Sequence, residues 1–123
     1  METLPIQEYS QRIPEEIRRA VNGLNNETRA AIVAYLSEVG EAPFTRLEKE
    51  LAIGKPALAA HLKILTQSGL IAHFYKHEFP NDQYSYYGLS DFGKGFLRNL
   101  INTLRPQTDV YRRVRLTLSL IHI

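Results

Sequence analysis

Lysines and histidines supply the charge in the centre of this 123-residue chain. Between Glu50 and Glu78 the only residues that carry or can gain charge are Lys55, His61, Lys63, His73, Lys76 and His77. Residues 53–123 hold 9 basic and 4 acidic side chains, whereas residues 1–52 hold 6 basic and 9 acidic ones. A cationic half suits a polyanionic partner, although an ordinary mixed surface can have the same composition.

The residue types that catalysis or metal binding requires are not grouped. The chain has no cysteine, no phosphate-binding glycine loop, no HExxH pair and no serine in a nucleophile elbow. His73 and His77 lie four apart in a predicted strand, which separates them by roughly 13 Å and prevents them from chelating one ion unaided. We expect a non-catalytic protein that needs no metal or cofactor.

The amino-acid composition also indicates the cellular compartment of the protein. A chain without cysteine fits a reducing environment, and no run of about 18 apolar residues is present to span a membrane. The N-terminus lacks the basic-then-apolar order of a signal peptide. We expect a cytoplasmic protein that does not contact a membrane.

Three helices are predicted before residue 53. Apolar residues at helical spacing predict the first over about 14–24, and Asn25–Asn26 then offer caps for a second that stops at Gly40. Residues 40–43 are predicted to form a short loop. Thr45 and Glu48 match a capping box, which predicts a short third helix over about 45–52.

A fourth helix is predicted from Pro56 to Ser68, after a tight turn at Ile53–Gly54 and before Gly69. Leu58, Leu62 and Leu65 fall within a narrow arc and are expected to face the core. The opposite face is small and cationic.

Alternating residues then predict a β-hairpin. The first strand starts at Ile71, Phe79–Asp82 suits a type I turn, and Gln83–Leu89 forms the return strand. The tyrosines of the return strand favour cross-strand packing, with a stacking platform for single-stranded nucleic acid as the alternative.

A fifth helix is predicted from a cap at Ser90 to Pro106, and its apolar stripe is wider than one small core needs. We expect the excess to meet the first helix of a second copy. The predicted dimer interface comprises Ile13, Ile17, Val21, Leu97, Leu100, Ile101 and Leu104.

Two helices around a tight turn, followed by a hairpin and a last helix, form a winged helix-turn-helix. The predicted fold is mainly α with a small β-hairpin, in the order α-α-α-turn-α-β-β-α. Residues 1–24 are predicted to be an N-terminal arm and dimerisation helix, and residues 25–105 the DNA-binding domain with the last helix. Residues 106–123 form a tail for which extended structure is favoured over a helix.

From about Glu27 to Leu104 the chain resembles the arsenic-repressor-like (ArsR) family of transcription regulators. The resemblance rests on His61-Leu62-Lys63-Ile64-Leu65 with Gly69-Leu70-Ile71, and on Tyr87-Gly88-Leu89-Ser90-Asp91-Phe92-Gly93. MarR-like regulators share the layout. The resemblance implies a homodimer that binds operator DNA and represses transcription. Metal-sensing members carry a cysteine pair where this chain reads Leu47-Glu48-Lys49-Glu50-Leu51, so their sensor site is absent.

In this layout a recognition helix over about 55–68 enters the major groove and a wing over about 71–89 contacts the backbone. His61 is as well suited to packing as to DNA contact. The alanine-rich helix offers few donors to base edges, which keeps a protein-binding module of a larger assembly as the alternative. A small-molecule effector is compatible with the layout, but no residue indicates which molecule it would be. The predicted DNA contacts are Thr45, Lys55, Pro56, Ala57, Ala59, Ala60, His61, Lys63 and Lys76.

Overall fold

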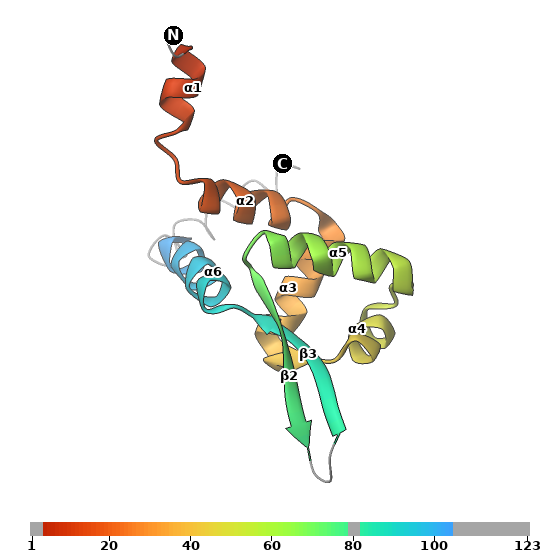
Figure 1. Cartoon of the computed structure of the whole chain (residues 1–123). Helices are drawn as coiled ribbons and strands as arrows, with labels where there is room; N and C mark the ends of the chain where they lie inside the picture. Colours follow the sequence, from red (N-terminus) through yellow and green to blue (C-terminus); the bar gives the residue numbers. More distant parts are fainter. Residues whose placement is uncertain (1–3, 79–81, 105–123) are drawn as a thin grey trace, which may run out of the picture.

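The computed structural model describes residues 4–78 and 82–104. Six helices and three strands follow one another in the described chain (Figure 1). Their order is α1 (Pro5–Ser10), α2 (Glu15–Leu24), α3 (Glu27–Val39), β1 (Glu41–Ala42), α4 (Phe44–Leu51), α5 (Lys55–Gln67), β2 (Ile71–Glu78), β3 (Asp82–Leu89) and α6 (Asp91–Leu104).

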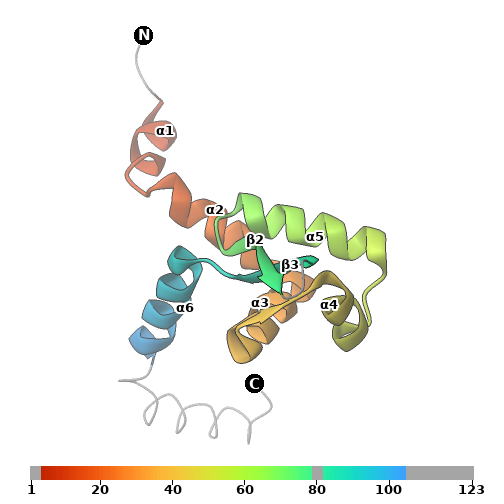
Figure 2. The same ribbon diagram turned by 60° about the horizontal axis from the view of Figure 1, so that its bottom comes forward.

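The core lies where α2, α3, α4 and α5 pack together against the inner ends of the strands (Figure 2). Helix α3 has a wide buried face, and α4 and α5 each turn their leucines toward it. These side chains are withdrawn from water almost completely, and burying each of them contributes about 1.5–3 kcal/mol to folding. The largest are Ile32, Leu36, Leu47, Leu58, Leu65 and Leu70.

The sheet has three strands rather than two. Strands β2 and β3 form the predicted antiparallel hairpin, in which Ile71 pairs with Leu89 and Glu78 pairs with Asp82. Strand β1 pairs with the other edge of β3, and Ala42 lies opposite Tyr87. The prediction of a loop over residues 40–43 was therefore wrong for two residues, because a strand that short has no periodicity to detect. The predicted turn includes residues 79–81, which lie outside the described residues.

Several predicted caps are confirmed. The Asn26 side chain accepts a hydrogen bond from the Arg29 amide at 3.0 Å, and Ser90 Oγ accepts one from the Gly93 amide at 2.8 Å. Gly40 and Gly69 end their helices with φ values of 87° and 81°, a conformation that glycine adopts without strain.

One local prediction was wrong. Helix α4 begins at Phe44 behind Pro43, so Thr45 lies inside the first turn and caps nothing. The proline ring fixes φ near the helical value and starts the helix one residue early. In the predicted turn after α4, Ala52 takes the left-handed conformation with φ of 51°, and Gly54 is the extended residue that precedes α5. The turn still ends α4 and starts α5 where the sequence predicted.

Helix α1 was not predicted. It projects beyond α2, outside the packed body of the molecule (Figures 1 and 2). It has no buried residue, and Leu4, Ile6 and Tyr9 expose between 61% and 83% of their surface. The fold is the predicted winged helix-turn-helix with α1 and β1 added. The predicted extended tail over residues 106–123 lies outside the described residues, and the predicted domain limits stay predictions.

No helix within residues 4–78 and 82–104 is long and apolar enough to cross a membrane.

Candidate nucleic-acid interface

The outer face of α5 is the centre of the candidate interface. Leu58, Leu62 and Leu65 anchor the helix, each with 2% or less of its surface exposed. The residues between them point to solvent because they fall on the opposite side of a helical period. All the predicted contacts of this helix except His61 are exposed: Lys55, Pro56, Ala57, Ala59, Ala60 and Lys63.

This face combines small side chains with two ammonium groups. Alanine side chains at positions 57, 59 and 60 add little bulk, so another surface can approach the helix backbone closely. Lys63 lies in the middle of the helix and Lys55 at its first turn. The arrangement can accommodate a polyanion with a close surface fit, whereas it offers few side-chain hydrogen bonds.

Helix α4 lies before α5 and presents Thr45 and Arg46 to solvent. Leu47 is fully buried and fixes α4 on the core. The Arg46 guanidinium lies 5.9 Å from the centre of the Tyr35 ring, which holds it against α3. The sequence selected Thr45 as a contact and passed over Arg46, although both are exposed on the helix that precedes α5.

His61 is half-buried and lies at the side of α5 rather than on its outer face. Its Nδ1 is 3.4 Å from a guanidinium nitrogen of Arg29, whose Nε donates to the Gly23 carbonyl at 2.8 Å. The sequence left packing and DNA contact equally open for His61. The structure places it against the α2–α3 junction, beside the Arg29 guanidinium.

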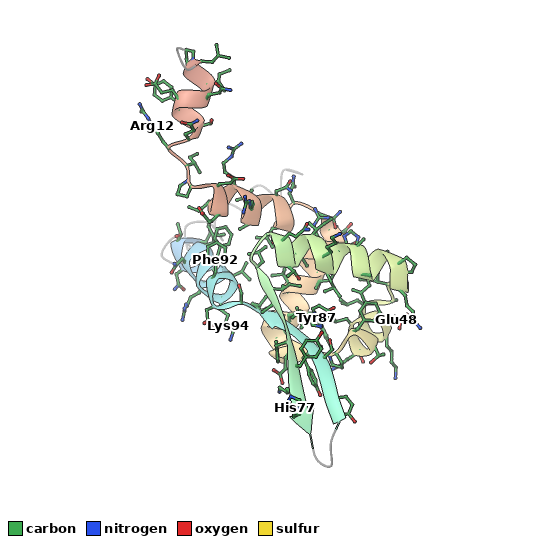
Figure 3. The ribbon with its side chains drawn as sticks, viewed as in Figure 1. Arg12, Glu48, His77, Tyr87, Phe92 and Lys94 are labelled. Atoms are coloured by element: carbon green, nitrogen blue, oxygen red, sulfur yellow. The ribbon has the colours of Figure 1, made fainter. Side chains whose placement is uncertain are left out.

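A groove of about 260 Å³ separates α5 from the wing. Lys63, Thr66 and Gln67 line it from the helix. His73 and Tyr87 line it from the strands, and their rings stack at 4.4 Å with 6° between the planes. Figure 3 shows Tyr87 on the sheet below α5 and His77 farther along the wing. The sequence interpreted His73 as plain wing surface; its alternation with Ile71 was the signal that it lies on the helix side.

Burial raises the pKa of Tyr87 above its ordinary value of 10.0, and the neighbouring Tyr75 phenol raises the pKa further. The phenol of Tyr87 is therefore neutral at physiological pH. It can donate one hydrogen bond within the groove without repelling a polyanion.

The Lys76 side chain is held by other side chains of the sheet. Its ammonium pairs with the Glu41 carboxylate of β1 and lies 5.1 Å from the centre of the Tyr86 ring. The sequence predicted a backbone contact for Lys76 and gave no role to Glu41, because the pairing depends on β1. A phosphate at this position would have to compete with the Glu41 carboxylate.

Among the described residues, no three histidine, cysteine or acidic side chains come close enough together to hold a metal ion.

The predicted dimer surface is exposed in the single chain. Ile17 and Val21 on α2, together with Ile13 just before the helix, expose 41–54% of their surface. On α6, Leu100, Ile101 and Leu104 expose 48–62%, while Leu97 is half-buried against the core. Two separate apolar stripes thus flank the helix-turn-helix, and nothing in the described chain covers them.

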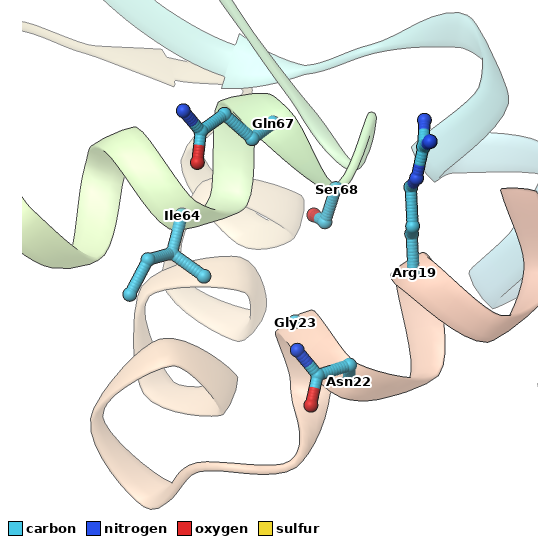
Figure 4. A pocket seen from close by; sticks show the side chains of 6 residues that line it. All are labelled: Arg19, Asn22, Gly23, Ile64, Gln67 and Ser68. Carbon is cyan, nitrogen blue, oxygen red and sulfur yellow. The ribbon is translucent and has the colours of Figure 1, made fainter.

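Helix α2 is fixed firmly to α5. A cleft of about 400 Å³ lies where the two helices meet, lined by Arg19, Asn22, Gly23, Ile64, Gln67 and Ser68 (Figure 4). At its base a Cβ atom on Gly23 would lie only 2.8 Å from Ser68 Oγ. The absence of a side chain at Gly23 therefore allows α2 to contact the end of α5 directly, which sets the position of the exposed α2 stripe relative to the outer face of α5.

Comparisons with known proteins agree with this geometry. Residues 26–73, from the cap of α3 to the third residue of β2, match the sequence family described as "Bacterial regulatory protein, arsR family". Over these residues the chain is similar to ArsR-family regulators, and the match supports a DNA-binding transcriptional regulator with a winged helix. No curated protein matches the chain.

Solved structures share the winged-helix fold. A transcriptional regulator homologue from Pyrococcus horikoshii OT3 superposes with a TM-score of 0.58 at 22% identity, covering 80% of this chain and 98% of that one. The transcriptional repressor BigR from Xylella fastidiosa gives 0.56 at 24% identity, with 80% and 91% covered. A MarR-family regulator from Enterococcus faecalis V583 gives 0.61 at 19% identity, with 94% and 96% covered. At these identities the likeness establishes the fold.

Proposed function

We propose that this ArsR-like regulator is a cytoplasmic, non-catalytic homodimer that represses transcription by inserting α5 into the major groove of its operator. The wing strands β2 and β3 lie beside the DNA backbone in this arrangement. The observation that carries the proposal is the outer face of α5: an exposed, small and cationic surface on a helix whose other side is fully anchored in the core.

The alanine face predicts how the operator is recognised. A helix with bulky side chains is held away from the groove floor, whereas Ala57, Ala59 and Ala60 permit close van der Waals approach to thymine methyl groups. Lys55 and Lys63 are the charged groups of this face, and the half-buried His61 lies at the side of the helix. We therefore expect recognition through apolar contacts and DNA shape more than through bidentate hydrogen bonds.

The two exposed apolar stripes support the dimer. A twofold dimer that buries the α2 stripe of one copy against the α6 stripe of the other removes both from water. Because α2 also contacts α5 at Gly23 and Ser68, this dimer would fix the distance between its two recognition helices. Half-sites about 34 Å apart are the expected operator spacing.

Thr45 and Lys76 are proposed as flanking contacts. Thr45 is exposed on α4, the helix that lies across the backbone in this type of docking. Lys76 reaches a phosphate only after its ammonium leaves the Glu41 carboxylate, so its contribution depends on how strongly that pair is held.

The test is a salt titration of duplex binding, with DNA from upstream of the protein's own gene and a scrambled duplex as control. A dimer that contacts on the order of 6–10 phosphates should lose about three to five decades of affinity between 50 and 200 mM salt. It should prefer the upstream DNA throughout. An affinity that barely changes over this range would favour the protein-binding module instead.

A further inference from the structure

We infer that α1 is an arm that docks on a second copy of this chain, in the groove between α3 and α6. The inference rests on the proposed homodimer and names an additional contact within it. It explains why a helix with no buried residue carries apolar side chains, and it gives the groove a defined occupant.

The groove has an apolar floor and a cationic rim. It has a volume of about 350 Å³, and Leu36, Leu89, Leu97 and Ile101 supply its apolar atoms. Lys94 and Arg98 are exposed on the α6 side, and Ser37 and Gly40 close the α3 side. An occupant that fits must be apolar on one side and acidic on the other.

Helix α1 has this composition. Ile6 exposes 83% of its surface, Leu4 66% and Tyr9 61%. Glu8 lies between them, and residues 1–11 contain two glutamates and no lysine or arginine. The helix can therefore place an apolar side chain on the groove floor while Glu8 approaches Lys94 or Arg98.

The groove of the same chain is on the wrong side for α1. Phe92 of α6 borders Glu16 and Arg19 of α2, so this side of α6 faces α2. At about 100° per residue, the groove residues of α6 lie between 140° and 240° around the helix from Phe92. They are Lys94, Leu97, Arg98 and Ile101. The groove therefore faces away from α2. Only residues 11–14 join α1 to α2, a span of at most about 14 Å.

A second copy presents the groove in a suitable position. Ile101 belongs both to the groove and to the α6 stripe proposed to meet the partner's α2. Because α1 immediately precedes α2, an α2 that packs on a partner's α6 brings its own α1 beside the partner's groove.

The cationic rim of the groove favours α1 over residues 105–123, the other apolar segment that could compete for the groove. Residues 105–123 are rich in leucine, isoleucine and valine, but they contain four arginines and a single acidic residue, Asp109. A basic segment is repelled by Lys94 and Arg98, whereas Glu8 of α1 is attracted.

The absence of cysteine allows a direct cross-linking test in the full-length chain. An Ile6→Cys chain is mixed with a Ser37→Cys chain and oxidised, and a disulfide-linked pair containing one chain of each kind is expected. Ala31→Cys replaces Ser37→Cys as a matched control, because Ala31 is exposed on α3 but lies outside the groove. The control should give at least tenfold less mixed product.

Charge reversal provides a second measurement. Glu8→Lys should weaken the dimer up to about tenfold in sedimentation, since a twofold dimer loses two exposed ion pairs. Adding Lys94→Glu to the same chain should restore the affinity.

The outcomes separate this inference from the proposed function. Wild-type monomers would overturn both. A stable dimer without the Ile6–Ser37 cross-link would overturn the arm alone and leave the operator-binding dimer standing. Two further results would overturn the arm. One is a disulfide that forms within a single chain carrying both Ile6→Cys and Ser37→Cys but not between two chains. The other is a disulfide between Leu118→Cys and Ser37→Cys where none forms between Ile6→Cys and Ser37→Cys.

Discussion

Single residues decide how closely the elements of this protein approach one another. Gly23 lets α2 contact α5 at Ser68, and Gly93 brings α6 against the end of α5 and the start of β2. A Cβ atom on Gly93 would lie 2.1 Å from the Leu70 carbonyl oxygen, a distance that no side chain tolerates. Ser90 Oγ donates to the Gly69 carbonyl and caps α6, so the same junction is also fixed by hydrogen bonds.

Gly93→Ala should lower the free energy of unfolding by about 1–3 kcal/mol or more, because backbone atoms of Leu70 have to move. Gly95→Ala is the matched control, since Gly95 is in the same helix and a Cβ atom there meets nothing within 4 Å. The control should gain roughly 0.5–1 kcal/mol from helix propensity. Urea denaturation followed by circular dichroism measures both. Equal effects of the two substitutions would show that the Gly93–Leu70 contact is not as close as described.

Local sequence signals predicted most of these residues correctly. The caps at Asn26 and Ser90 and the terminators Gly40 and Gly69 depend only on near neighbours, so the sequence sufficed. Thr45 failed as a cap because Pro43 competes for the same position. The pairing of Lys76 with Glu41 and the position of His61 beside Arg29 depend on contacts between distant segments, which no local pattern encodes.

At the scale of elements, α5 and the wing should contribute to binding in different ways. Lys63 is exposed on the recognition helix, where bases and phosphates are both within reach. Lys76 lies on β2 and is held by Glu41, so it can contact only the backbone and only after that pair opens. The two lysines should therefore affect operator and non-operator DNA differently.

Lys63→Ala should cost roughly 1–3 kcal/mol more on operator than on scrambled duplex if Lys63 contacts bases. Lys76→Ala should weaken both duplexes nearly equally and reduce the salt slope by about one per subunit. Paired titrations on the two duplexes measure both effects. A Lys76→Ala variant that loses only operator affinity would contradict the assignment of the wing to the backbone.

Glu41→Gln tests the same ion pair through its other partner. Neutralising Glu41 releases the Lys76 ammonium, so duplex affinity should rise and the salt slope should steepen. In a chain that already carries Lys76→Ala, the same substitution should have little effect. An equal gain in both backgrounds would mean that Glu41 acts by general repulsion of DNA and not through Lys76.

The longer elements were predictable because apolar residues recur in them over three or more turns, or alternate along a strand. The six residues of α1 bury nothing, so they carry no core-facing pattern. The two residues of β1 are too few for a period, and their pairing is fixed by β3, more than 40 positions away. The formation of β1 thus depends on tertiary context, whereas α1 was missed because it lacks a core-facing pattern.

At the scale of the whole molecule, the described residues leave two surfaces exposed: the apolar stripes of α2 and α6, and the outer face of α5. The apolar stripes imply a second copy of the chain, and the outer face of α5 implies DNA. The contact between α2 and α5 links them, because movement at the dimer interface would change the separation of the two recognition helices.

Leu100→Glu should convert the dimer to monomers, because it places a charge in a surface that pairing removes from water. Leu100 is 48% exposed in the single chain, so the fold should survive. Asn99→Glu, at the exposed neighbouring position of α6, is the control and should leave the dimer intact. Sedimentation at tens of micromolar measures the oligomeric state. Wild-type monomers at this concentration would remove the basis of the dimer.

Ala60→Glu tests whether the outer face of α5 enters the major groove. Ala34→Glu makes the same change at an exposed position of α3, on the side of that helix opposite its buried residues. Both variants are titrated against operator and scrambled duplex, with circular dichroism as the control for folding. The account predicts that Ala60→Glu abolishes binding through steric and charge conflict with DNA, while Ala34→Glu binds nearly as the wild type does. A folded Ala60→Glu protein with wild-type affinity would contradict it.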